Sequence, residues 1–126
     1  MQTEPPSVEI RFTSEFERRL RSLFKKYRQI RSNIQPVIEQ LQSGGTPGDQ
    51  ISGTGTTVFK VRVKNSDIKK GKSAGYRIIY QIASPSSIVL LTIYSKSDRI
   101  DISTAEILQI LTEFEQQSEG EGTGED

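Results

Sequence analysis

Residues 76–94, YRIIYQIASPSSIVLLTIY, decide the fold of this chain. Two segments in this run, 76–83 and 88–94, are rich in β-branched and aromatic residues, and the turn-forming residues SPSS lie between them. The second segment is almost continuously apolar, which predicts a strand inside the sheet with both faces covered. The expected centre of the molecule is therefore a pair of adjacent antiparallel strands.

Strand periodicity continues upstream of this pair. Three apolar residues alternate with three basic ones in the order Phe59, Lys60, Val61, Arg62, Val63, Lys64. With the two strands that follow, this segment predicts a three-stranded antiparallel meander. Val8, Ile10 and Phe12 alternate in the same way and predict a short N-terminal strand, whereas the Gly-, Ser- and Thr-rich residues 43–57 predict a loop.

Helical spacing marks three further segments. Ser14 followed by Glu17 has the form of a capping box at the start of an apolar pattern that reaches residue 27. A second pattern spans 30–41, with Ser32 or Asn33 as its cap and Pro36 acceptable only in the first turn. These two segments predict an antiparallel helical hairpin. A second capping box, Ser103 with Glu106, predicts a C-terminal helix that ends near Gln117.

The predicted architecture is one α+β domain of two layers. It consists of an N-terminal strand, a helical hairpin, a three-stranded antiparallel meander and a C-terminal helix, with the helices on one face of the sheet. The chain of 126 residues suits a single core. The domain is expected to span 7–117, between a flexible leader at 1–6 and an acidic disordered tail at 118–126, SEGEGTGED, which has no apolar residue.

The composition excludes several kinds of chemistry. The chain has no Cys and no His, so it lacks disulfides, thiolate ligands and an imidazole base, and we expect no metal and no cofactor. No apolar run approaches the roughly 20 residues of a membrane span, and the first ten residues lack the features of a signal peptide. A soluble cytoplasmic protein without a membrane partner is the expectation.

The charges divide the chain into a basic body and an acidic end. Residues 11–99 hold all 17 basic residues and six acidic ones, a net charge of +11, while residues 100–126 hold eight acidic residues and no basic one. This pattern is typical of a cationic surface that meets a polyanion. The alternative is a solvated surface with an acidic solubilising tail.

Seven cations fall within residues 60–77, against Asp67 alone: Lys60, Arg62, Lys64, Lys69, Lys70, Lys72 and Arg77. Alternate residues of a strand lie roughly 6.6 Å apart on one face, so cations here would crowd where an anion could bind. An ordinary solvent-facing strand protected by Lys is the alternative. Arg77 lies among bulky residues and suits a bidentate anion grip, or a structural pair with Glu9, Asp98 or Asp101.

Three tyrosines lie in the same region of the chain. We expect two of Tyr76, Tyr80 and Tyr94 in the core and one on the open face of the sheet, where it could stack on a base. Tyr94 is the candidate for the open face, because it ends its strand just before the polar run SKSDR.

The string GKSAGYRIIYQI, followed by an apolar strand and YSKSDRIDIS, resembles toxins of the RelE and HigB type within the RelE/ParE toxin–antitoxin superfamily. The resemblance covers about residues 57–106. It implies that Lys60 and Arg62 take the places of the two basic residues on the family's second strand, and that Arg77 matches the Arg of its SGYR segment. Ser97 and Ser103 depart from the RelE pattern, whereas Tyr94 and Lys96 match a YxK context of the HigB branch.

This resemblance implies a ribosome-dependent mRNA endoribonuclease that inhibits translation. The implied catalytic residues are Lys60, Arg62, Arg77, Tyr94 and Lys96, and the RNA-binding residues are Lys64, Lys69, Lys70, Lys72 and Arg99. Its partners would be the ribosome, mRNA and a cognate antitoxin in a toxin–antitoxin hetero-oligomer. The alternatives are a ParE-like inhibitor of DNA gyrase and a non-catalytic RNA-binding module.

Overall fold

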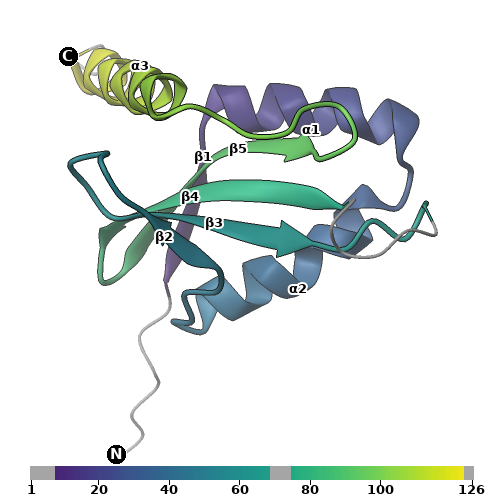
Figure 1. Cartoon of the computed structure of the whole chain (residues 1–126). Helices are drawn as coiled ribbons and strands as arrows, with labels where there is room; N and C mark the ends of the chain where they lie inside the picture. The colour runs from purple at the N-terminus through teal and green to yellow at the C-terminus, as the bar shows by residue number, and fades with distance from the viewer. Residues whose placement is uncertain (1–7, 69–74, 124–126) are drawn as a thin grey trace, which may run out of the picture.

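The computed structural model describes residues 8–68 and 75–123 as a mixed α+β fold with the predicted order of elements and one additional strand. The elements are β1 (Glu9–Phe12), α1 (Ser14–Lys26), α2 (Ile30–Gln42), β2 (Asp49–Ile51), β3 (Val58–Val63), β4 (Tyr76–Ser84), β5 (Ser87–Ser95) and α3 (Thr104–Thr123) (Figure 1). The predicted leader, 1–6, lies outside the described residues.

All five strands form one sheet in the order β1-β5-β4-β3-β2. The meander β3-β4-β5 is antiparallel as predicted, and β1 pairs in parallel with β5. The apolar strand β5 therefore lies inside the sheet, between β1 and β4, and eight of its nine residues are buried. This confirms the interpretation of IVLLTIY as a strand covered on both faces.

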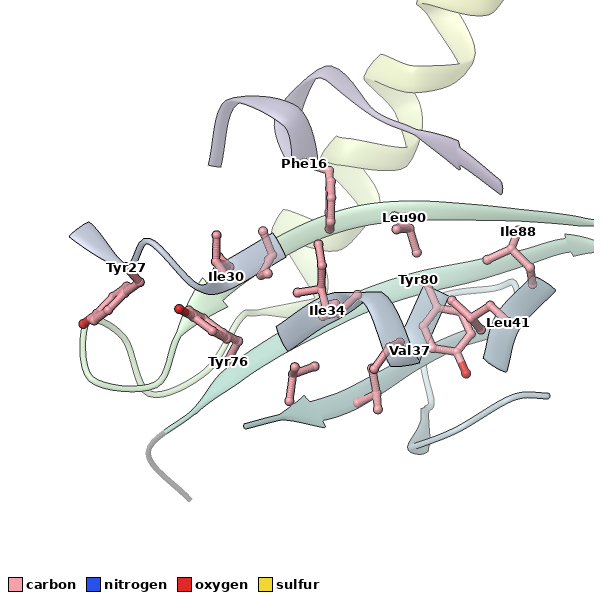
Figure 2. Close-up of a cluster of buried hydrophobic side chains, with 14 residues drawn as sticks. Phe16, Tyr27, Ile30, Ile34, Val37, Leu41, Tyr76, Tyr80, Ile88 and Leu90 are labelled. Carbon is pink, nitrogen blue, oxygen red and sulfur yellow. The ribbon is translucent and has the colours of Figure 1, made fainter. Parts of the chain in front are cut away.

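The helices cover opposite faces of this sheet. Ile78 and Tyr80 of β4 pack with buried residues of α1 and α2, whereas Ile79 between them packs with Ile107 of α3. Figure 2 shows Tyr80 beside Val37 and Leu41 of α2. Because neighbouring strand residues point to opposite faces, α3 lies on the side away from α1 and α2. The molecule therefore has three layers. The expectation of two layers was wrong, because β4 and β5 are apolar on both faces and need cover on each.

Helix α1 begins one residue earlier than its sequence pattern indicates. Its N-cap is Thr13, whose Oγ1 accepts a hydrogen bond from the Phe16 N–H at 2.9 Å. The same hydroxyl donates to the Leu91 carbonyl at 2.6 Å. Ser14 is exposed and is already the first helical residue. The predicted capping box of Ser14 and Glu17 is therefore wrong, since Thr13 caps the helix and also bonds the sheet.

Helix α2 begins without a side-chain cap of its own. The N–H of the N-cap residue Gln29 donates to Asp67 Oδ2 at 2.9 Å. The acceptor at this helix start therefore comes from a residue distant in the sequence. Asn33, a predicted cap, instead bonds Ser66 in the turn after β3, with Nδ2 3.0 Å from its Oγ. Pro36 lies inside the helix rather than in its first turn. The predicted start was wrong because these tertiary contacts extend the helix back to Ile30.

Strand β2 lies within the stretch predicted as a loop. It pairs antiparallel with β3, and Asp49, Gln50 and Ile51 stand opposite Lys60, Phe59 and Val58. The strand is short and largely exposed, so it has no apolar pattern for sequence reasoning to detect. Its position becomes visible only through its backbone pairing with β3.

Helix α3 confirms the second capping box and extends past its predicted end. The Glu106 N–H donates to Ser103 Oγ at 3.1 Å, and the Ser103 N–H donates to Glu106 Oε1 at 3.3 Å. The helix continues to Thr123 rather than ending near Gln117. Extending an existing helix requires less free energy than nucleating one, so six residues of the predicted disordered tail are helical. Residues 124–126 lie outside the described range.

Candidate functional site

Strand pairing brings the predicted basic residues together on the α3 face of the sheet. Arg62 of β3 stands opposite Arg77 of β4, which in turn stands opposite Tyr94 of β5. Lys60 stands opposite Ile79, which packs with Ile107 of α3, and Lys60 therefore shares this face. The side chains of Lys60, Arg62 and Arg77 thus converge from two adjacent strands.

These residues line one cavity of about 340 Å³. Its walls are Asp49, Gln50, Ile51, Lys60, Arg62, Arg77 and Lys96. Lys96 reaches it from the segment after β5, and its backbone N–H bonds the Gly75 carbonyl at 2.9 Å. Four cations from three segments therefore surround one hollow, and all four were predicted site residues. The part of the wall that β2 supplies, Asp49 to Ile51, was not predicted.

Arg77 is the most deeply placed of the four cations. The residue is only 4% exposed, and Nη1 donates to the Tyr76 carbonyl at 3.1 Å. Burial, with the positive charge of Arg62 as a second cause, lowers the pKa of Arg77. An anion in the cavity would relieve the like-charge repulsion between the two guanidinium groups. This arrangement suits the binding of a phosphate.

Tyr94 does not offer an open ring face. Only 6% of the residue is exposed, and the Arg99 guanidinium lies 5.6 Å from the ring centroid. Its hydroxyl donates to Asp101 at 3.4 Å, and burial raises its pKa. The expectation that this ring could stack on a base is therefore wrong, because α3 and Arg99 cover it. Tyr76 and Tyr80 are fully buried, as expected for two of the three tyrosines.

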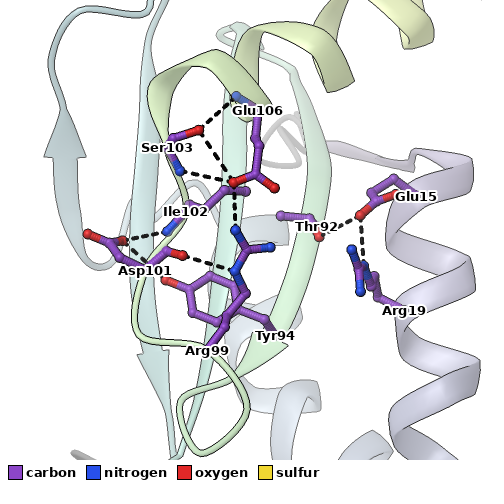
Figure 3. Close-up of polar contacts among 9 residues, drawn as sticks. All are labelled: Glu15, Arg19, Thr92, Tyr94, Arg99, Asp101, Ile102, Ser103 and Glu106. Carbon is purple, nitrogen blue, oxygen red and sulfur yellow. Dashed lines mark hydrogen bonds and ion pairs between the residues drawn. The ribbon is translucent and has the colours of Figure 1, made fainter.

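Asp101 lies in the loop before α3 (Figure 3) and contacts Lys60 of the cavity wall. Its carboxylate accepts hydrogen bonds from the Ile102 N–H at 2.8 Å, Lys60 Nζ at 3.2 Å and the Tyr94 hydroxyl at 3.4 Å. The Ile102 bond is the largest cause of a lowered pKa, and the Lys60 ammonium contributes further. Sequence reasoning considered Asp101 only as a pair for Arg77 and missed its contact with Lys60.

The predicted RNA-binding residues have different surroundings. Arg99 donates to the Asp101 carbonyl at 2.9 Å and to Glu106 Oε1 at 2.5 Å, so it ties the loop to the start of α3 (Figure 3). Lys64 is exposed directly after β3 and is not among the cavity-lining residues. Lys69, Lys70 and Lys72 lie outside the described residues.

Residues 8–68 and 75–123 contain neither a metal-binding cluster nor a membrane-spanning helix. Within these ranges, no group of three His, Cys, Asp or Glu side chains is arranged to hold a metal ion. Across the same part of the chain, every helix is too short or too polar to span a membrane.

Comparison with known proteins identifies the family. Residues 10–100 match the family model described as the ParE toxin of the type II toxin–antitoxin system parDE. A comparison with curated proteins yields no match. The matched range runs from β1 through the meander to the segment that carries Lys96, so it includes every residue of the cavity. The chain therefore belongs to the ParE toxin family of type II toxin–antitoxin systems.

Proposed function

We propose that this toxin is a ribosome-dependent mRNA endoribonuclease that works without a metal ion. The observation that carries this proposal is the convergence of Lys60, Arg62, Arg77 and Lys96 on one cavity. RNA has a phosphate at every nucleotide, and a hollow surrounded by cations attracts that backbone. Membership of the type II family implies a cognate antitoxin, whereas the ribosome and mRNA are partners that this proposal adds.

The chemistry rests on alignment and charge. Strand scission begins when a ribose 2′-oxygen lies in line with its own phosphorus, and holding that geometry removes much of the barrier. In this proposal Arg62 and Arg77 grip the scissile phosphate, and Lys60 and Lys96 stabilise the negative charge that develops on it. Tyr94 acts indirectly, since its hydroxyl and Lys60 Nζ share the Asp101 carboxylate.

Replacing Arg77 tests the proposal. Arg77→Ala removes the buried cation, and we expect cleavage of a defined mRNA in a translation extract to fall roughly 100-fold or more. Arg62→Ala should act in the same direction, and Arg62 is exposed, so its replacement preserves the core. Thermal unfolding of both variants separates loss of chemistry from loss of fold.

The matched control is Lys25→Ala, which removes an exposed cation of α1 on the opposite side of the sheet. This variant should cleave at the wild-type rate. If folded Arg77→Ala and Arg62→Ala both retained wild-type cleavage, the proposal would be wrong.

Inhibition of DNA gyrase is the second candidate, because the matching family is described as the toxin of the parDE system. This function would require a protein-binding surface and no RNA scission. A supercoiling assay with purified gyrase, run beside the translation extract, separates the two candidates. Loss of supercoiling with intact mRNA would replace the nuclease proposal, whereas cleaved mRNA with normal supercoiling would support it.

A further inference from the structure

Asp49 is the one carboxylate side chain in the wall of the cationic cavity, counting the lining residues that the structure describes. It stands opposite Lys60 across the β2–β3 pair, so its side chain lies on the same sheet face as the cations. The residue is exposed. Within residues 8–68 and 75–117, its carboxylate takes part in no hydrogen bond or ion pair.

The carboxylates of the loop before α3 and of the first turn of α3 already have hydrogen-bond donors. Asp101 accepts three hydrogen bonds, one of them from Lys60, and Glu106 accepts from Arg99 and Ser103. A carboxylate that only balanced the charge of the cavity would be expected to pair with a neighbouring cation, as Asp101 does with Lys60. Asp49, which lines the cavity, instead has carboxylate oxygens that are free to accept a proton.

We propose that Asp49 is the general base of the cleavage reaction, an inference that rests on the proposed nuclease function. Its carboxylate accepts the proton of the ribose 2′-hydroxyl as the 2′-oxygen forms a bond to phosphorus. The bond from phosphorus to O5′ breaks, its electron pair leaves with O5′, and Lys96 Nζ donates a proton to that oxygen. The products are a 2′,3′-cyclic phosphate and a 5′-hydroxyl, and water returns the proton from Asp49 to Lys96.

Asp49→Asn isolates this role, because the amide has nearly the shape of the carboxylate but cannot accept the proton. A positioned general base contributes about 10²- to 10⁴-fold. We therefore expect single-turnover cleavage, measured with excess toxin on ribosomes that carry a defined mRNA, to fall about 100-fold or more. Affinity for a labelled RNA oligonucleotide should stay equal or increase, because one negative charge leaves a cationic cavity. Asp49→Glu, which restores a carboxylate, should recover part of the rate.

The matched control is Glu39→Gln, the same chemical change at an exposed position of α2, and it should leave the rate unchanged. Wild-type cleavage by Asp49→Asn would overturn the assignment while leaving the nuclease proposal intact. Equal loss of cleavage in Asp49→Glu and Asp49→Asn, or loss of RNA affinity that matches the loss of rate, would also overturn it. Absence of cleavage by the wild-type toxin would refute the nuclease function itself and this inference with it.

Discussion

A single hydroxyl group, that of Thr13, joins the first helix to the sheet. Its oxygen accepts from the Phe16 N–H and donates to the Leu91 carbonyl, and the residue is only 2% exposed. Removing the hydroxyl would leave a helix N–H without its cap and a buried strand carbonyl without a donor. Two structural elements therefore depend on this one side chain.

We predict that Thr13→Ala lowers the free energy of unfolding by about 1–3 kcal/mol, the range of a lost cap together with an unsatisfied buried group. Ser14→Ala removes a similar hydroxyl one residue later, where the side chain is exposed, and should change stability by less than about 0.5 kcal/mol. Urea denaturation of the two variants measures the difference. Equal midpoints would contradict the assignment of Thr13 as the cap.

At the scale of elements, β2 positions one wall of the cavity, and a glycine controls how closely it can approach β3. Gly48 precedes the strand with a φ of +98°, and a Cβ at this position would overlap the Lys60 carbonyl oxygen. The close approach of the two backbones at this point therefore requires a residue without a side chain. The same contact fixes Asp49 beside the cations.

Gly44 and Gly48 form a matched pair for testing this contact. Both have φ near +97°, but a Cβ at Gly44 would meet nothing within 4 Å. Gly44→Ala should therefore lower the free energy of unfolding by only the backbone strain of about 1–2 kcal/mol. Gly48→Ala should lower it further and displace β2 from β3, which increased amide exchange at 49–51 would reveal. Equal effects of the two changes would show that the contact is unimportant.

The elements that sequence reasoning identified correctly are those with a local pattern. Alternation identifies β3, and the reciprocal pair Ser103 and Glu106 marks the start of α3. The features that sequence reasoning missed depend on hydrogen bonds to residues distant in the sequence. Asp67 bonds the start of α2, and β2 exists through its pairing with β3, so neither leaves a signal in neighbouring residues.

At the scale of the whole molecule, one face of the sheet carries the larger core and the other carries the cationic cavity. One face carries α1 and α2 over the larger core, while α3 covers only part of the other and leaves the cationic cavity beside it. Strand alternation and the order of the meander could predict Lys60, Arg62 and Arg77 of this cavity, whereas Lys96, which follows β5, was predicted only through the family resemblance. Sequence alone could not predict the burial of Tyr94 or the contact of Asp101 with Lys60, because both depend on the position of α3 and its preceding loop.

The salt dependence of RNA binding tests most directly whether this cavity holds an RNA backbone. For single-stranded nucleic acid, the logarithm of the affinity falls with the logarithm of the salt concentration by about 0.7 for each phosphate neutralised. We predict that Arg62→Ala reduces the magnitude of this slope by about 0.7, whereas Lys25→Ala, on the opposite side of the sheet, leaves it unchanged. An unchanged slope for Arg62→Ala, or an equal reduction for both variants, would contradict the central claim that the cavity is where RNA binds.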